Sequence, residues 1–436
     1  MAALVSRETA EAETRPVAAP TRRAYLHHMD LIRVTTFSMV IFAHCLTQTN
    51  DEFSSIPVNS TSMLLHVTRN TFFALTGFVL MYQNYDKNNF STITFWRRRL
   101  KLTIYPYIIW SAVYWVVEDM WVPGKLGQIP TNLDDFLRLL SWGLSGFQMY
   151  FLFVMLQVYL IFPLVLWLVR ATARHHGPLL AGSLTAQVAI ASTITHWNPP
   201  ASMANYWWHH YATFVPYQFF ILYGAVAAVH RESIADWLSG KRWWLLGSLL
   251  ATTALALGSY LYSVLVAGKP AHDSNSAFHP TLIPFVIVAM TCQYAAAVHW
   301  AARWREHTPR FARAVQYASN RSFAVFLVHV LIIFFILMPS SGTRPWILAT
   351  VPQPWATTIV YLGTLAGSLL MAEVLRRLPG ALYFTGRQRI PLRRKPVARL
   401  TDTAATIVGD LTQTTRANAE PTQGDQPVSN NTIGET

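Results

Sequence analysis

The chain has 436 residues, of which 52% are hydrophobic, 13% are aromatic and only 13% are charged. An ordinary soluble domain carries about a quarter charged residues, so this composition excludes a disordered chain, and the two cysteines exclude a disulfide scaffold. The net charge of +13 does not indicate a nucleic-acid partner, because the basic residues lie beside apolar runs. We therefore expect a polytopic membrane protein embedded in a lipid bilayer.

The predicted elements start after residues 1–24, a polar segment without the apolar core of a signal peptide. A bilayer core of about 30 Å requires about 20 apolar residues per helix. We predict an all-α membrane bundle of ten spans, of which the fifth has a polar end and the sixth contains Pro216. The ten spans are residues 29–49, 62–84, 102–121, 148–169, 178–197, 213–230, 243–266, 280–301, 320–338 and 354–375.

The distribution of the 34 lysine and arginine residues supports these spans. If the N-terminus is inside the cell, most of them fall in inner loops, as the positive-inside rule requires for an even number of spans. Both termini are therefore expected in the cytoplasm, with residues 25–380 as the membrane domain and 381–436 as a basic, then disordered tail. The predicted outer loops contain only Lys125, Arg138, Lys269 and Arg344.

The first span carries ionisable residues, which are costly inside a bilayer and indicate a functional site. Arg33 and His44 are 11 residues apart, so they lie on one helical face about 16 Å apart along the axis. Asp30 precedes Arg33 by one turn and can pair with its guanidinium. The alternative is structural: Asp30 and Arg33 anchor the helix at the membrane edge, and His44 makes a hydrogen bond between helices.

Five segments carry a family resemblance. The stretch HHMDLIRVTTFSMVIFAHCL resembles the first helix of the acyltransferase-3 family of integral membrane acyltransferases, whose signature is an arginine, ten residues and then a histidine. Further family motifs are matched in the right order, and the resemblance extends over about residues 25–380. The other matching segments are FFALTGFVLMY (72–82), FWRRRLKLTIYPYIIW (95–110), YFLFVMLQVYLIFP (150–163) and SNRSFAVFLVH (319–329).

The resemblance implies an enzyme of the bacterial inner membrane that moves an acyl group from acetyl-CoA or another acyl-CoA. The acceptor would be a sugar hydroxyl of an envelope glycan or glycolipid, such as a trehalose glycolipid. His44 would act as general base or carry the acyl group, while Arg33, held by Asp30, would hold the donor or stabilise the oxyanion. Alternative functions are export of a glycan or lipid without chemistry, or a structural role in envelope assembly.

A basic loop is predicted before the third span, with Arg98, Arg99 and Lys101. Its arginine forks suit the phosphates of an acyl-CoA presented from the cytoplasm. The alternative is that these cations only fix the topology of the helix.

Four further residues are candidates for substrate binding: Arg69, His66, His329 and Gln157. Arg69 lies well inside the second span, where it either contacts substrate or pairs with Asp30 or Glu118. His329 is either catalytic or a satisfied core histidine. The outer histidine and tryptophan clusters at 196–198 and 206–210 are expected to anchor helices or stack on sugars, not to bind a metal.

Three features depart from the family pattern. Met155 stands where many members have an acidic residue, as in the branch of intercellular-adhesin glycan proteins. Arg98 and Lys101 stand where many members have two arginines, and lysine cannot form the guanidinium fork. The attached hydrolase-like domain of some members is missing, so transfer is expected to finish on the membrane domain.

Overall fold

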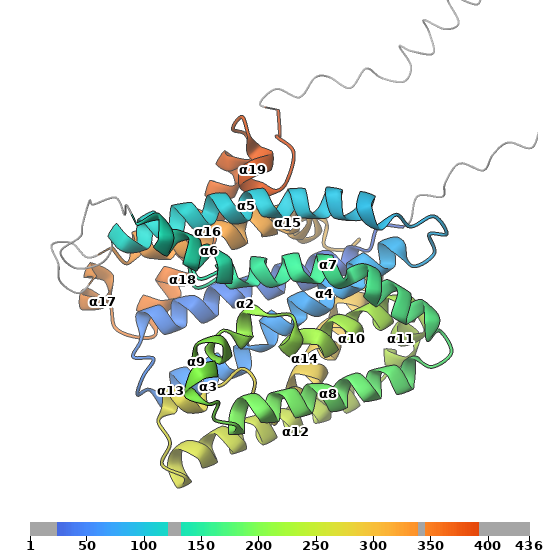
Figure 1. Cartoon of the computed structure of the whole chain (residues 1–436), viewed down its shortest axis with the longest axis horizontal. Helices are drawn as coiled ribbons and strands as arrows, with labels where there is room; N and C mark the ends of the chain where they lie inside the picture. Colours follow the sequence, from blue (N-terminus) through green and yellow to red (C-terminus); the bar gives the residue numbers. More distant parts are fainter. Residues whose placement is uncertain (1–23, 121–131, 339–344, 392–436) are drawn as a thin grey trace, which may run out of the picture. The chain divides into compact units, whose positions relative to one another are not determined.

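The computed structural model describes residues 24–120, 132–338 and 345–391. These ranges form helices without any strand, which confirms the predicted all-α membrane bundle (Figure 1). Nearly all of the predicted polar N-terminal segment and most of the predicted tail lie outside the described residues. The helices, 3₁₀ turns and π turns are α2 (His27–Thr49), α3 (Ile56–Leu65), α4 (Val67–Asn84), α5 (Thr92–Met120), α6 (Leu133–Trp142), α7 (Met149–Ala171), α8 (His176–His196), α9 (Ala201–Trp208), η1 (His210–Ala212), η2 (Val215–Tyr217), α10 (Gln218–Val229), α11 (Arg231–Leu238), α12 (Arg242–Leu261), η3 (Tyr262–Val266), α13 (Ala271–Ser274), α14 (Leu282–His299), η4 (Trp300–Trp304), α15 (Pro309–Ser319), α16 (Ser322–Ile336), α17 (Trp346–Thr350), α18 (Trp355–Leu375) and α19 (Ala381–Thr385).

Eight helices among the described residues are long and apolar enough to cross a membrane, and each corresponds to a predicted span. The other two predicted spans are less regular. The predicted ninth span, residues 320–338, is formed by α16 alone, which has 15 residues and meets the preceding helix α15 at an angle of 73°. The predicted sixth span is a short apolar helix, Val215–Val229. It starts with the 3₁₀ turn η2, where Pro216 is tolerated because the first turn of a helix does not need its missing N–H.

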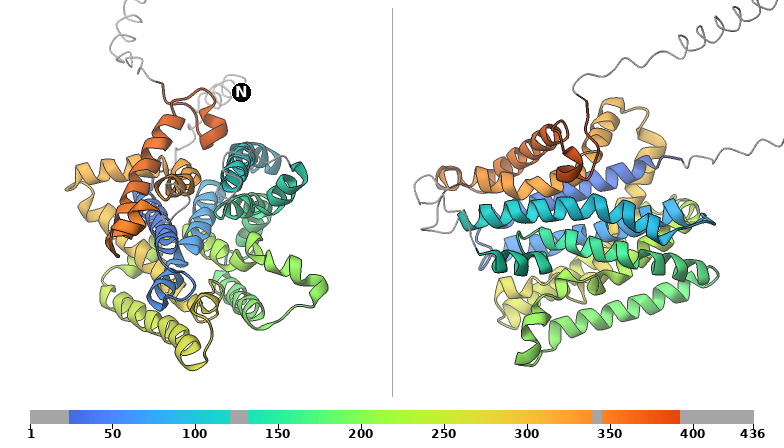
Figure 2. Two further views of the ribbon diagram at one scale, coloured as in Figure 1. Left: turned by 90° about the vertical axis from the view of Figure 1, so that its left-hand side faces the viewer. Right: turned by 45° about the horizontal axis from the view of Figure 1, so that its top comes forward.

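Helices α2 and α4 lie in the middle of the bundle, surrounded by the other helices (Figure 2). Helix α4 meets α10 almost backbone to backbone, because a glycine faces the partner helix on each side. A Cβ atom added to Gly77 would lie 2.2 Å from the carbonyl oxygen of Ile221, and one added to Gly224 would lie 1.8 Å from that of Ala74. Small residues that allow such close approach are typical of helix pairs in membranes.

Helices α8 and α12 lie at the outside of the bundle and bury few side chains. On α12, only Ala256 and Tyr260 are buried, while Trp243, Trp244 and Leu250 are at least 70% exposed. Such an apolar surface would be a liability in water, but it is the expected surface of a helix that faces lipid.

The chain folds back over the bundle after α18. The indole N–H of Trp110 on α5 donates a hydrogen bond to the carbonyl of Phe384 on α19, at 2.9 Å. Ala381 and Thr385 are each 1% exposed. The compact unit extends to Arg389, eight residues beyond the position where we predict the tail to start.

We expect Gly224→Ala to destabilise the protein, because its new methyl group would collide with the backbone of Ala74. Overpacking of this kind lowers the free energy of unfolding by about 1–3 kcal/mol. The measurement is the apparent Tm in detergent. Gly247→Ala on α12 is the matched control, because nothing lies within 4 Å of its Cβ position. Equal Tm values for both variants would contradict the close helix contact.

Reporter fusions test the expected topology. A reporter at the N-terminus and one at residue 400 should both show a cytoplasmic signal, because the basic loops favour an even number of crossings. A periplasmic signal from only one of the two fusions would show an odd number of crossings, so that one of the two short spans, the sixth or the ninth, does not cross the membrane.

Candidate active site

Helix α2 presents Asp30, Arg33 and His44 from one uninterrupted apolar helix. Asp30 and Arg33 lie near its N-terminal end, at what we call the basic end of the bundle. His44 lies three turns further along, toward the opposite end. The two ends of this helix border two different polar cavities, one beside His44 and one beside Asp30.

Asp30, Arg33 and Ser319 form a hydrogen-bonded network at the basic end. The Ser319 hydroxyl donates to Asp30 Oδ1 at 2.6 Å, and Arg33 Nη1 donates to Ser319 Oγ at 2.9 Å. Arg33 Nη1 also lies 3.7 Å from Asp30 Oδ1, so the predicted pair of Asp30 and Arg33 is confirmed. Asp30 is only 3% exposed, and the network therefore ties α2 to the last residue of α15.

Tyr25 completes this network from outside the helices. Its hydroxyl donates to both carboxylate oxygens of Asp30, at 2.9 and 2.8 Å. Partial burial and then the hydrogen bond to Asp30 raise the pKa of Tyr25 to about 12, so the phenol keeps its proton at neutral pH. Sequence reasoning missed Tyr25 and Ser319, although Ser319 opens one of the motifs that carry the family resemblance.

His44 lines a polar cavity of about 340 Å³, which we call the His44 cavity. Its ring lies against Phe147, with centroids 4.6 Å apart, and against His329, with centroids 5.4 Å apart. No other described residue makes a hydrogen bond to this ring. The polar side chains that line the cavity with it are Thr47, Glu52, Asn59, Ser62, His66, Thr68, Arg69, Gln148, Tyr150, His272 and Asn275.

Arg69 contributes a guanidinium to the same cavity. It lies 4.6 Å from the ring centre of Phe278 and 5.2 Å from that of Tyr217, and its Nη1 donates to the Tyr150 hydroxyl at 3.4 Å. Its Nε and Nη2 atoms are buried and have no hydrogen-bond partner among the described residues. Arg69 forms no ion pair within the part of the chain that the structure describes, so the predicted pairing with Asp30 or Glu118 is wrong.

His66 lies at a break in the second span, between α3 and α4. Its Nε2 is 3.1 Å from Oδ1 of Asn275, and Nδ2 of Asn275 donates to Oδ1 of Asn59 at 3.1 Å. His66 thus contacts the residue that directly follows α13, and the new helix α4 starts two residues before Arg69. Nothing in the hydropathy of residues 62–84 signals this interruption.

His329 is fully buried beside His44 but does not line its cavity. Its Nδ1 is 2.7 Å from the carbonyl of Phe326, which can only accept, so this nitrogen carries the proton. Nε2 is then an acceptor, and it has no partner among the described residues. The structure thus gathers His44 from the first predicted span, His66 and Arg69 from the second, and His329 from the ninth.

The other predicted residues lie elsewhere. Arg98, Arg99 and Lys101 do not form a loop, because α5 starts at Thr92 and carries them in its first turns. Arg98 and Lys101 are exposed, and Arg99 is hydrogen-bonded to Gln83. None of the three lines the His44 cavity.

Gln157 also lies apart from the His44 cavity. Its amide donates to the carbonyl of Ala212 at 2.8 Å and accepts from the backbone N–H of Phe214 at 3.1 Å. These two bonds hold the irregular segment before η2 against α7. In this structure Gln157 therefore stabilises the fold of that segment.

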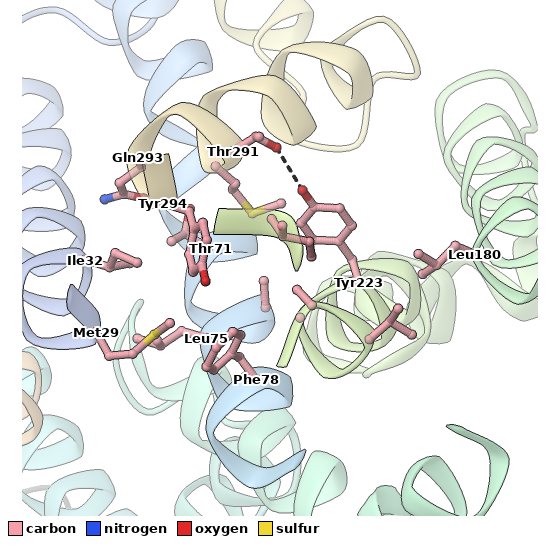
Figure 3. Close-up of a pocket in the computed structure, with 16 residues that line it drawn as sticks. Met29, Ile32, Thr71, Leu75, Phe78, Leu180, Tyr223, Thr291, Gln293 and Tyr294 are labelled. Carbon is pink, nitrogen blue, oxygen red and sulfur yellow. Dashed lines mark hydrogen bonds between the residues drawn. The ribbon is translucent and has the colours of Figure 1, made fainter. Parts of the chain in front are cut away.

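Two further cavities lie toward the basic end. A polar one of about 330 Å³, the basic-end cavity, is lined by the start of α2, η4 and α15. An apolar one of about 120 Å³ lies between α2, α4, α10 and α14 (Figure 3). Its few polar groups are satisfied: the Tyr223 hydroxyl is hydrogen-bonded to Thr291, and the Gln293 amide to Thr35 and Thr36.

A family model described as an acyltransferase domain, Acyl_transf_3, matches residues 26–373. This segment contains the Asp30 network and the His44 cavity, and it is well over half of the chain. Comparison with curated proteins and with solved structures finds no match. The match confirms the resemblance of the five motifs: the chain belongs to the acyltransferase-3 family of integral membrane acyltransferases.

Proposed function

We propose that this membrane acyltransferase moves an acyl group, most simply acetyl, from an acyl-CoA to a sugar hydroxyl of a bacterial cell-envelope glycan or glycolipid. The observation that carries the proposal is the His44 ring, which lines a polar cavity and has no hydrogen-bond partner among the described residues. A buried polar group without a partner costs stability. The same state suits a general base, which has to be free to accept a proton from substrate.

His44 acts on the acceptor hydroxyl. As the hydroxyl oxygen attacks the thioester carbonyl, a ring nitrogen of His44 takes the hydroxyl proton. The carbon–sulfur bond breaks, the thiolate leaves with the electron pair, and the imidazolium returns the proton to it. A histidine can instead carry the acyl group for a two-step transfer.

Arg69 and Tyr150 are better placed than Arg33 to assist at the reacting carbonyl. Arg33 lies about 16 Å from His44 along α2, a separation that an arginine side chain does not bridge. Arg69 and Tyr150 line the cavity with His44 and are hydrogen-bonded to each other. A phenol that bonds a guanidinium is a suitable donor to the oxyanion of the transition state. Arg33 then serves the donor at the basic end.

We expect His44→Ala to reduce acyl transfer at least about a hundredfold, the lower end for a lost general base. The measurement is turnover per amount of detergent-stable protein, with acetyl-CoA and an envelope extract as substrates. The control is His175→Ala, which removes an exposed histidine at the start of α8, outside the His44 cavity. Wild-type turnover by folded His44→Ala protein would overturn the proposed role of this residue.

We expect Arg33→Lys to reduce turnover about tenfold or more, since loss of a charge-assisted hydrogen bond of about 1.5 kcal/mol has this effect on rate. The ammonium keeps the charge but is a compact point charge on a flexible chain, so it does not reproduce the planar guanidinium whose Nη1 contacts both Ser319 and Asp30. Ser319→Ala should reduce turnover by a smaller factor than Arg33→Lys does. Full activity of both variants would indicate that the network only anchors α2.

A further inference from the structure

The basic-end cavity has no role in the chemistry at His44. It has about the same volume as the His44 cavity, at 330 Å³, and it lies beside the opposite end of α2. His27 and Asp30 line it from α2, Trp300 from η4, and Arg313 from α15, while Arg305 comes from the turn between η4 and α15.

We propose that the basic-end cavity binds the phosphorylated nucleotide end of the acyl-CoA donor, with Arg305 and Arg313 as its phosphate ligands. The inference rests on the proposed function, since it assigns a site to the donor of that reaction. It also moves the predicted phosphate site from Arg98 and Arg99 on α5 to the cavity between the start of α2, η4 and α15.

The charge of the cavity favours an anion. Within the described ranges neither Arg305 nor Arg313 forms an ion pair, and Arg313 donates only to the carbonyl of Pro309, at 3.3 Å. The carboxylate of Asp30 is already occupied by Tyr25, Ser319 and Arg33. Glu306 is the other acidic residue of the lining, and it is exposed. Two guanidinium groups therefore remain for a ligand, and guanidinium forks suit phosphate.

Two helices begin at this cavity. His27 starts α2 and Pro309 starts α15, and both residues belong to the lining. Neither helix has a side-chain cap at its N-terminus, so backbone N–H groups of both first turns are left for another acceptor. The positive ends of the two helix dipoles add to the attraction for phosphate.

An aromatic residue in the lining suits the base of the nucleotide. Trp300 starts the π turn η4 and packs edge to face on Phe311, with centroids 5.7 Å apart. Its indole N–H is buried and has no partner among the described residues. An adenine ring offers both a face for stacking and nitrogen acceptors for such a donor.

The position of the cavity also agrees with the shape of the donor. Asp30 in its lining and His44 are 14 residues apart on α2, which corresponds to about 21 Å along the helix. An acyl-CoA carries its phosphates at one end of a long pantetheine arm and its thioester at the other. A ligand with two distant ends suits two cavities at the two ends of one helix.

The test is equilibrium binding of CoA to detergent-purified full-length protein. We expect Arg305→Gln with Arg313→Gln to weaken CoA binding at least about tenfold, as for the loss of one charge-assisted contact. 3′-Dephospho-CoA should bind wild type more weakly than CoA, and the double variant should discriminate less between the two ligands. The matched control is Arg303→Gln with Arg310→Gln, which removes the same charge from exposed residues of the same segment outside the lining.

Two outcomes would overturn the inference but keep the proposed function. In the first, the Arg305/Arg313 variant binds CoA like wild type while Arg98→Gln with Arg99→Gln weakens it, which would place the phosphates on α5. In the second, CoA binding is unchanged and the variant loses only its stabilisation by phosphatidylglycerol in nanodiscs, which would assign the cavity to a lipid phosphate. A wild-type protein that binds no CoA would overturn both proposals.

Discussion

A polar group inside a bilayer has to find its partner within the protein, because the surrounding lipid offers none. This constraint explains the arrangement around α2. At one end of the helix, Asp30 and Arg33 satisfy each other with the help of Ser319, which joins α2 to α15. At the other end, Nε and Nη2 of Arg69 are buried without a hydrogen-bond partner among the described residues, and the His44 ring contacts only aromatic rings there. The ion-paired network of Asp30 and the proposed general base His44 thus lie at opposite ends of one helix.

The helices could be predicted from the sequence because apolar runs of bilayer length have few other structures available. The boundaries were less predictable. Helix α5 starts at Thr92, well before its apolar part, because a helix can continue into water while hydropathy records only the segment in lipid. The break at His66 also leaves no signal in hydropathy.

The site was predictable only where its residues are close in sequence. The pairing of Asp30 with Arg33 follows from helical spacing of three residues. The aromatic cover of Arg69 does not, because Tyr217 and Phe278 come from segments far along the chain. An expected ion pair for Arg69 was reasonable from the cost of a buried charge, but the protein places the guanidinium between aromatic faces instead.

The contact of α4 with α10 has a consequence for access to the His44 cavity. Because Gly77 and Gly224 bring the two backbones together, these helices have no room to slide past each other. Arg69 belongs to α4, and Tyr217 directly precedes α10, so the cation and this ring move together. Phe278 lies in a turn between α13 and α14, outside any helix. A change in the conformation of this turn would therefore move the Phe278 ring away from Arg69 and leave the Tyr217 ring in place.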